Sequence, residues 1–276
     1  MSRRLELVGQ NVAPPVWAAL RSQAQDAADA EPTLASLLNA VVLSHNSLGE
    51  ALSYQLARKL SDQELRAMSA REFCDAAFAD EPDLVRQAEA DLKAVFERDP
   101  ACKSYVQPFL FFKGFQALQT YRVAHWLWRH GRQTLALYLQ SRMSEIFQVD
   151  IHPAAEIGVG VFLDHGTGIV IGETAVVGDD VSMLHGVTLG GTGAERGNRH
   201  PKIGKGVLLG AGSKVLGNIT VGDYAKIASG SVVLKPVPAH CTAAGVPARL
   251  VNCPTCDEPA RTMDHTLADV VYDYVI

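Results

Sequence analysis

The 276-residue sequence predicts an α+β protein in three consecutive parts: an α-helical N-terminal domain over residues 1–148, a left-handed parallel β-helix over residues 149–251, and a flexible C-terminal tail over residues 252–276. Two observations lead to this prediction. The first half of the chain repeats apolar residues at helical spacing, whereas the second half repeats them at every sixth position. A period of six fits neither a helix nor a half-buried strand, and it is typical of a solenoid with three short sides per coil.

The N-terminal domain is expected to consist of amphipathic helices. Apolar residues recur at helical spacing from Thr33, a plausible cap, and a leucine stripe continues the pattern as far as Leu60. At Ser61 and at Ser69, a Ser is followed three positions later by Glu, which is typical of capping boxes at helix starts. Three more helices are expected over residues 83–98, 109–130 and 134–147.

Trp126 and Trp128 lie close together in one of these expected helices. Aromatic side chains at helical spacing usually pack in a core, so we expect core or subunit contacts here and not a cofactor site. A solenoid also needs a cap on its terminal coil. Because the helical domain ends directly before the repeat, it is well placed to supply that cap.

The six-residue repeat is interrupted twice. Between Ile169 and Ile171 the register slips by two residues, and between Leu189 and Ile203 the spacing is fourteen residues instead of six. The second interruption is an inserted loop that is rich in Gly and basic residues. Insertions in solenoids lie at corners and often gather on the binding face, so we expect function at this loop.

Composition excludes several classes of protein. The formal net charge is -5 and there is no basic stripe, which argues against a nucleic-acid partner. No window approaches ~20 uninterrupted apolar residues, so we expect no membrane-spanning helix. The first residues lack the apolar core of a secretory signal, which predicts a cytoplasmic location.

Cysteine usage fits reduced thiols better than a disulfide framework, because the number of cysteines is odd and their spacing is scattered. Cys253 and Cys256 form a lone CxxC sequence with no second pair. Unpaired thiols are therefore expected there in preference to a structural zinc site. The five cysteines are Cys74, Cys102, Cys241, Cys253 and Cys256.

Histidines gather in or beside the repeat, and three kinds of chemistry are open to them. Neighbouring coils could bind zinc with a free position for water, one His could act as a base in acyl transfer, or each could be a hydrogen-bonded corner residue. Since one coil is about eighteen residues long, Asp150 and His165 can come within a coil height of each other. A carboxylate that holds one ring nitrogen leaves the other free as a base. The five histidines are His152, His165, His185, His200 and His240.

The inserted loop adds Arg199 and His200 to these candidates. A guanidinium binds a carboxylate through two parallel hydrogen bonds, so Arg199 suits an amino-acid substrate, although a solvated loop charge is the alternative. The Gly-rich run over residues 189–193 is not a phosphate loop, because no helix follows it.

Several short segments are more specific than the repeat itself. They are Asp150-Ile-His-Pro153, Leu163-Asp-His165 and Arg199-His-Pro-Lys202, accompanied by Lys113-Gly-Phe115, Gly172-Glu-Thr-Ala175 and Ala243-Ala-Gly-Val-Pro247. Through these segments, and over nearly its whole length, the chain resembles bacterial serine acetyltransferases. The resemblance implies transfer of acetyl from acetyl-CoA to the hydroxyl of L-serine, giving O-acetyl-L-serine and CoA, as the first step of cysteine biosynthesis from serine and with no metal.

The same resemblance implies a role for six residues. By this resemblance His165 looks like the general base and Asp150 looks like its partner. His200 looks like a second catalytic or substrate-binding imidazole. Three charged side chains are implied to bind the substrate: Asp99 and Asp164 at the serine ammonium, and Arg199 at its carboxylate.

The resemblance also implies ligands and partners. CoA lies between neighbouring solenoids in this family, which assemble as homo-trimers or homo-hexamers, and L-cysteine is a feedback inhibitor. Ile276 matches the tail end that inserts into cysteine synthase (O-acetylserine sulfhydrylase). Two alternatives stay open: a hexapeptide acetyltransferase for another hydroxyl acceptor such as a sugar or homoserine, or a catalytically weak regulatory partner of cysteine synthase. The implied CoA contacts are Gly191, Thr192, Ala211 and Ser229.

Overall fold

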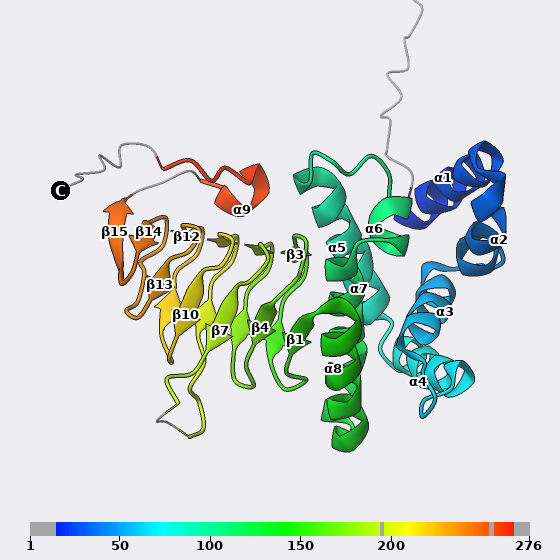
Figure 1. Ribbon diagram of the computed structural model, residues 1–276, viewed down its shortest axis with the longest axis horizontal. Helices are drawn as coiled ribbons and strands as arrows, with labels where there is room; N and C mark the ends of the chain where they lie inside the picture. Colours follow the sequence, from blue (N-terminus) through cyan, green and yellow to red (C-terminus); the bar gives the residue numbers. More distant parts are fainter. Residues whose placement is uncertain (1–14, 194–195, 254–256, 268–276) are drawn as a thin grey trace, which may run out of the picture.

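The computed structural model describes residues 15–193, 196–253 and 257–267, and it consists of a helical half followed by a β-solenoid (Figure 1). The coils of the solenoid stack away from the helices in chain order. No helix in these ranges is long and apolar enough to span a membrane. The helical elements before the solenoid are α1 (Val16–Ala30), η1 (Pro32–Leu34), α2 (Ala35–Leu38), η2 (Asn39–Leu43), α3 (Leu48–Leu60), α4 (Ala67–Asp80), α5 (Asp83–Arg98), α6 (Val106–Leu110), α7 (Lys113–Arg129) and α8 (Gln133–Phe147).

The helix predicted over residues 83–98 is confirmed as α5, but two other predicted helices are interrupted. The leucine stripe breaks between η2 and α3, where Ser47 is extended and caps α3 by accepting a hydrogen bond from the Glu50 N–H at 3.2 Å. The helix expected over residues 109–130 breaks at Phe112, whose extended backbone ends α6 and allows α7 to begin. Thr33 is not a cap, because it lies inside η1.

The two predicted capping boxes are also wrong. Residues after Ser61 form a turn, in which Asp62 accepts hydrogen bonds from the backbone N–H groups two and three positions later, at 2.9 and 2.7 Å. The next helix, α4, begins only at Ala67, so Ser69 lies within its first turn. An Asp side chain that bonds its own following backbone competes with helix formation, which explains the delayed start.

The solenoid has three flat sides, each a sheet in which short strands of successive coils pair in parallel, except for the antiparallel β14–β15 pair at the far end of the third sheet. The first sheet has the order β1-β4-β7-β10-β13, the second β11-β8-β5-β2 and the third β15-β14-β12-β9-β6-β3. The strands are β1 (Val149–Ile151), β2 (Glu156–Ile157), β3 (Phe162–Leu163), β4 (Ile169–Ile171), β5 (Val176–Val177), β6 (Ser182–Met183), β7 (Thr188–Gly190), β8 (Lys202–Ile203), β9 (Leu208–Leu209), β10 (Lys214–Leu216), β11 (Thr220–Val221), β12 (Lys226–Ile227), β13 (Val232–Val233), β14 (Thr242–Gly245) and β15 (Ala248–Asn252).

Strand register explains both interruptions of the repeat. Within a regular coil Val170 pairs with Thr188, eighteen residues later, but Leu163 pairs with Met183, twenty residues later. The two extra residues lie in the corner between β3 and β4. The inserted loop lies in the corner between β7 and β8, so both irregularities leave the stacked aliphatic core intact and change only corners.

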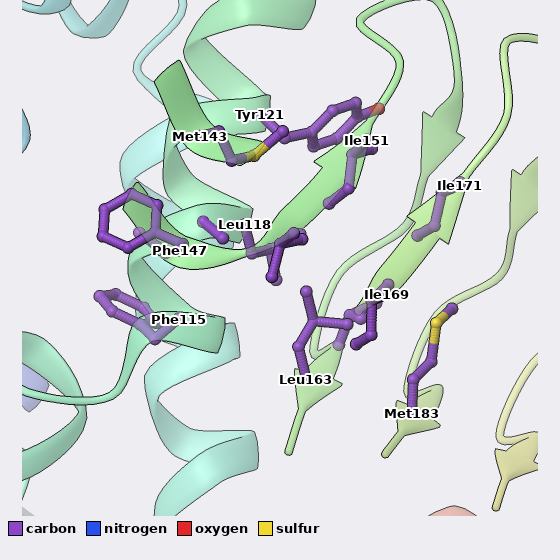
Figure 2. Close-up of a cluster of buried hydrophobic side chains, with 14 of the residues drawn as sticks. Phe115, Leu118, Tyr121, Met143, Phe147, Ile151, Leu163, Ile169, Ile171 and Met183 are labelled. Atoms are coloured by element: carbon purple, nitrogen blue, oxygen red, sulfur yellow. The ribbon is translucent and has the colours of Figure 1, made fainter. Parts of the chain in front are cut away.

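Helices α7 and α8 cap the first coil, which confirms the predicted role of the helical half. Figure 2 shows their side chains meeting the aliphatic interior of the first two coils. The packed residues have almost no contact with solvent, and burying each apolar side chain contributes about 1.5–3 kcal/mol. The labelled side chains are Phe115, Leu118 and Tyr121 of α7, Met143 and Phe147 of α8, and Ile151, Leu163, Ile169, Ile171 and Met183 of the solenoid.

The tryptophan pair also packs, as predicted. Trp126 is buried and donates from Nε1 to the Asp80 carboxylate at 2.8 Å. Trp128 is partly buried and meets the His152 ring edge-on, with centroids 5.1 Å apart. The pair therefore contributes to the helical core and to its junction with the solenoid.

A buried ion pair joins the helical half to the first coil. Asp91 of α5 and Arg122 of α7 are 2.8 Å apart, with side-chain exposures of 0% and 3%. Asp91 also accepts from the Val161 N–H at 3.0 Å, and Arg122 donates to the Gly158 carbonyl at 2.8 Å. Both charges therefore reach the solenoid backbone through hydrogen bonds.

The far end of the solenoid overturns the expectation of reduced thiols. Cys241 and Cys253 form a disulfide with Cα atoms 4.4 Å apart. The physical reason is the antiparallel β14–β15 hairpin, because its paired residues Thr242 and Asn252 directly follow Cys241 and directly precede Cys253. Cys74 and Cys102 are free and buried, and Cys256 lies outside the described residues.

Residues 257–267, inside the predicted tail, fold back over the third sheet. They contain α9 (Pro259–Thr262), whose Ala260 carbonyl accepts from the buried Ser182 hydroxyl at 2.8 Å. Met263 packs against a small apolar cluster that includes Val95 and Phe162, and Lys226 donates to the Thr266 carbonyl at 2.5 Å. This part of the tail is thus packed against the solenoid and α5. Ile276 lies outside the described residues.

Candidate functional site

The lengthened corner between β3 and β4 carries Asp164 and His165. Together with Asp99, the residue that follows α5, they form the first cluster of candidate residues, here called the His165 cluster. Together these residues line a pocket of about 430 Å³ beside the start of α7. His165 Nε2 lies 3.8 Å from Asp164 Oδ1, and the His165 side chain is 74% exposed. The structure therefore places a solvent-facing imidazole beside two carboxylates at one corner of the solenoid.

The electrostatic surroundings of Asp164 change its pKa. Burial raises the pKa of Asp164, His165 opposes this effect, and the neighbouring charge of Asp99 adds to the rise. A bound cation would favour the ionised form of both carboxylates. The cluster therefore suits a positively charged group on a ligand.

The start of α7 sets the position of this corner. If Gly114 carried a Cβ atom, that atom would lie only 2.0 Å from the Leu163 carbonyl oxygen, immediately before Asp164. Lys113, the first residue of α7, donates to the Thr167 hydroxyl on the other side of the corner. Sequence patterns missed Gly114, because a single Gly in a helix gives no signal of what its backbone touches.

Successive corners above His165 form one continuous edge of the solenoid. Backbone hydrogen bonds of 2.8 Å connect them, from Gly186 N–H to the Thr167 carbonyl and from Gly230 N–H to the Ala211 carbonyl. The His165 and His185 rings meet edge-on across two of these corners, with centroids 6.0 Å apart. Two of the expected CoA contacts, Ala211 and Ser229, lie farther along this same edge.

The inserted loop carries Arg199 and His200. Together with Glu173 and Thr174 of the corner between β4 and β5, they form the second cluster, here called the His200 cluster. Arg199 Nη2 lies 2.7 Å from Glu173 Oε2, and the hydrogen bond from Arg199 holds the pKa of Glu173 below its ordinary value. Gly191 lies against the aliphatic part of Arg199, and exposed Thr192 follows it in the loop. The other two expected CoA contacts therefore belong to this cluster's side of the molecule.

His200 is held on three sides. Its Nδ1 accepts a hydrogen bond from the Thr174 backbone N–H at 3.1 Å, and the Thr174 hydroxyl lies 2.9 Å from the same nitrogen. The imidazole lies over Gly172, where an added Cβ would be 2.1 Å from Nε2. Burial lowers the pKa of His200, and the charge of Arg199 lowers it further. Both effects favour the neutral ring.

The two clusters lie on opposite sides of the first sheet, one where its strands begin and the other where they end. Corners that precede β4 and β7 carry His165 and His185, whereas Glu173 and the inserted loop follow the same two strands. A strand of three residues spans roughly 10 Å, so the sheet keeps the clusters apart within one chain.

Asp150 lies in β1 of this first sheet and accepts a hydrogen bond from Gln140 Nε2 at 2.6 Å. Its negative charge acts on His152, which lies near Glu173 and Arg199. Among the described residues no hydrogen bond or ion pair joins Asp150 to His165. The predicted pairing of these two side chains is thus not made inside a single chain.

Sequence reasoning named His165, Arg199 and His200 but missed two of their partners. Glu173 and Thr174 stand in a segment typical of the repeat, and no spacing signal indicates that they face the inserted loop. Within the described ranges, no group of three or more His, Cys, Asp or Glu side chains is arranged to hold a metal ion.

Comparison with known proteins shows similarity over both halves of the chain. Residues 16–120 match the family model described as the N-terminal part of serine acetyltransferase, and residues 200–235 match the bacterial transferase hexapeptide model. The serine acetyltransferase of Escherichia coli K12 is 56% identical over 249 residues, covering 90% of this chain and 91% of that protein.

Two solved structures extend the similarity to three dimensions. A serine acetyltransferase in complex with cysteine has a TM-score of 0.90 at 52% identity, covering 91% of this chain and 98% of that one. A serine acetyltransferase in complex with CoA has a TM-score of 0.83 at 52% identity, covering 86% and 98% of the two chains.

Proposed function

The chain belongs to the serine acetyltransferase family and is a serine O-acetyltransferase, and we propose that it acts through direct attack of the serine hydroxyl on the thioester of acetyl-CoA. One observation supports this mechanism above all. Both interruptions of an otherwise regular repeat fall at corners, and each corner presents an imidazole together with charged side chains.

His165 is the proposed general base. A serine hydroxyl is a weak nucleophile until a base removes its proton as the new bond forms. His165 takes that proton while the hydroxyl oxygen attacks the thioester carbonyl carbon. The tetrahedral intermediate then collapses, the carbon–sulfur bond breaks, and the imidazolium returns its proton to the departing CoA sulfur. Acetyl is thus transferred with no net change in protons on the enzyme.

Charge complementarity supports serine as the acceptor. Asp99 and Asp164 would bind the ammonium group, while Arg199 would bind the carboxylate through its guanidinium. A neutral sugar offers no charges to this arrangement, and homoserine would place its hydroxyl one methylene farther from the base. The distribution of charge therefore favours a short amino-acid alcohol.

A homo-trimer would bring the two clusters together. Since the clusters occupy opposite ends of the same sheet, a closed ring of three solenoids can place the His165 cluster of one subunit against the His200 cluster of the next. Asp150 would then reach His165 across this interface. CoA would lie in the groove along the same edge, between Ala211 and Ser229 on one side and Gly191 and Thr192 on the other. Pairing of trimers into a hexamer would use the helical halves.

Release of CoA thiol with L-serine, L-homoserine and a galactoside tests the acceptor. We expect turnover to be fastest with L-serine and unaffected by a metal chelator. Turnover with the sugar alone would support an acetyltransferase that acts on another hydroxyl. No turnover with any acceptor would leave the alternative of a regulatory partner of cysteine synthase. Loss of turnover on addition of the chelator would support a zinc mechanism.

Substitution of the base tests the mechanism. His165→Ala is expected to lower kcat by about a hundredfold or more, with little change in the KM for serine, because the base acts only as the proton moves. His240→Ala, at a corner away from both clusters, provides the matched control. Near-normal turnover of His165→Ala would exclude His165 as the base.

Regulation is proposed to use the same site and the chain end. L-cysteine shares the ammonium and carboxylate of serine, so it should inhibit competitively with serine. The chain ending in Ile276 is proposed to bind cysteine synthase, both proteins being cytoplasmic. Removal of residues 268–276 should abolish co-elution with cysteine synthase while leaving serine acetylation intact, and co-elution of the shortened chain would contradict this assignment.

A further inference from the structure

The hydrogen bonds around His200 assign the position of its ring proton. Thr174 Oγ1 accepts from two backbone N–H groups, those of Arg199 at 3.0 Å and His200 at 3.1 Å. With both of its acceptor positions used, the hydroxyl can only donate, and His200 Nδ1 lies 2.9 Å away. The Thr174 backbone N–H points at the same nitrogen from 3.1 Å.

Two donors at Nδ1 leave no room for a proton there. A neutral imidazole carries its single N–H on the nitrogen that does not accept, so the ring proton of His200 lies on Nε2. If Nδ1 carried the proton, its N–H would point at the Thr174 hydroxyl and the Thr174 backbone N–H, and none of the three could accept a hydrogen bond from the others. In the described part of the chain no protein group hydrogen-bonds to Nε2, which leaves that N–H available to a ligand.

We propose that Thr174 is a positioning residue that holds His200 in the neutral Nε2–H form, so that His200 donates a hydrogen bond to a negatively charged oxygen of the reactants and does not act as a second base. This inference rests on the proposed function of the two clusters. It separates the roles of the imidazoles: His165 removes a proton, and His200 stabilises charge.

The surroundings of His200 favour the same state. Burial has the largest effect and lowers the pKa of His200. The charges of Arg199, Lys202 and His152 lower it further, and Glu173 opposes them. Gly172 lets the ring lie flat against the backbone, since any larger side chain would displace it. A neutral donor in a fixed position stabilises developing negative charge without reorganising during the reaction.

Glutamine and asparagine variants of His200 distinguish a donor from a base. The terminal amide nitrogen of Gln can replace Nε2–H as a donor, whereas that of Asn overlaps with Nδ1, and neither amide is a base. We expect His200→Gln to retain kcat/KM within about tenfold of the wild type, and His200→Ala and His200→Asn to lose about a hundredfold or more. If His200→Gln is as inactive as His200→Ala, the donor role is wrong.

The pattern of loss identifies which oxygen is bound. If His200→Ala lowers kcat at unchanged serine KM, the donor binds the oxyanion that develops from the thioester. If it raises the serine KM at unchanged kcat, the donor binds the serine carboxylate. Either result supports the inference. If the wild type does not acetylate serine, or if His165→Ala remains active, the proposed function is wrong, and this outcome is distinct from an error in the donor role of His200.

Thr174 variants test the positioning role through the ring itself. Thr174→Ser keeps the hydroxyl and should behave as the wild type, whereas Thr174→Val removes it. Nitrogen NMR of histidine-labelled protein, with the His200 signals assigned by their loss in His200→Gln, should show Nε2–H as the sole neutral form in the wild type and in Thr174→Ser. In Thr174→Val a mixture of tautomers and a raised His200 pKa are expected. An Nδ1–H signal in the wild type would overturn the inference.

Discussion

At the scale of single residues, close backbone approach decides where the reactive side chains lie. Gly114 lets α7 touch the Leu163 carbonyl, and Gly172 lets the His200 ring lie on the main chain. Neither glycine requires an unusual backbone conformation at these contacts. What matters at both positions is the absence of a Cβ atom.

Gly114→Ala is therefore expected to disturb the His165 cluster. Its methyl group would lie 2.0 Å from a carbonyl oxygen that belongs to the backbone and cannot move as a side chain does. We expect a destabilisation of about 1–3 kcal/mol, together with a fall in kcat/KM, measured by denaturation and CoA release. Gly49→Ala is the matched control, since Gly49 is likewise the second residue of its helix but faces a movable Val85 methyl at 3.2 Å. Equal activity in the two variants would contradict the prediction.

Serine binding should depend on the ionisation of Asp164. Its pKa is raised, chiefly by burial, and only the ionised form can bind an ammonium group. As the pH falls, the KM for serine should therefore begin to rise at a higher pH than an ordinary Asp, with a pKa of about 3.9, would cause. Asp164→Asn should have a higher KM that lacks this rise. Equal KM values for Asp164→Asn and the wild type would exclude the role of Asp164.

At the scale of elements, the structure depends on how helices meet the first coil. Helices α5 and α7 supply one charge each to a pair that is closed off from water and bonded to the solenoid backbone. The same two helices border the pocket at the His165 cluster, through Asp99 after α5 and Lys113 at the start of α7. The stability of the fold and the geometry of the His165 cluster therefore both depend on the contact of α5 and α7 with the first coil.

Breaking the buried pair should be costly. Arg122→Met leaves the Asp91 carboxylate buried without its partner, and we expect a loss of about 3–5 kcal/mol in the free energy of unfolding, measured by urea denaturation at fixed protein concentration. Arg86→Ala removes the partner of Asp83 from an exposed ion pair, with side-chain exposures of 71% and 49%, and should cost about 1 kcal/mol or less. Similar losses in both variants would show that burial of the pair is unimportant.

At the scale of the whole molecule, a solenoid with reactive groups at both ends of one sheet suits a ring. In the proposed homo-trimer each chain would offer half of a site at each of two corners, and the closed ring would pair these halves three times. This arrangement would make activity a property of the assembly. It also accounts for Asp150, whose bonding partner within the chain is Gln140 and not His165.

Mixed trimers test this arrangement. When His165→Ala and His200→Ala chains are co-expressed in equal amounts, about a quarter of the sites in a closed trimer should combine an intact His165 with an intact His200. Activity should recover to roughly that fraction of the wild type, measured as CoA release per subunit. Co-expression of His165→Ala with the double variant His165→Ala/His200→Ala should restore none. If both mixtures are equally inactive, each site is built within one chain.

Much of the fold could be predicted from local pattern. Every sixth residue must be aliphatic because it stacks on its counterpart in the next coil, so the period of six defines the solenoid, and its two interruptions mark the corners that hold His165 and His200. Helix ends were harder to predict. The side chains of Asp62 and Glu31 accept hydrogen bonds from nearby backbone N–H groups, and these bonds replace the caps expected at Ser61 and Thr33.

By itself, the sequence determined the solenoid, the capping helices and the identity of the main candidate residues, because each follows from spacing along the chain or from local segments that resemble those of serine acetyltransferases. Only the tertiary structure decided that Glu173 holds Arg199, that Thr174 directs the His200 ring, that Cys241 pairs with Cys253, and that the two clusters lie at opposite ends of one sheet. These contacts depend on the register between coils and on the path of the corners, and neither leaves a periodic trace in the sequence.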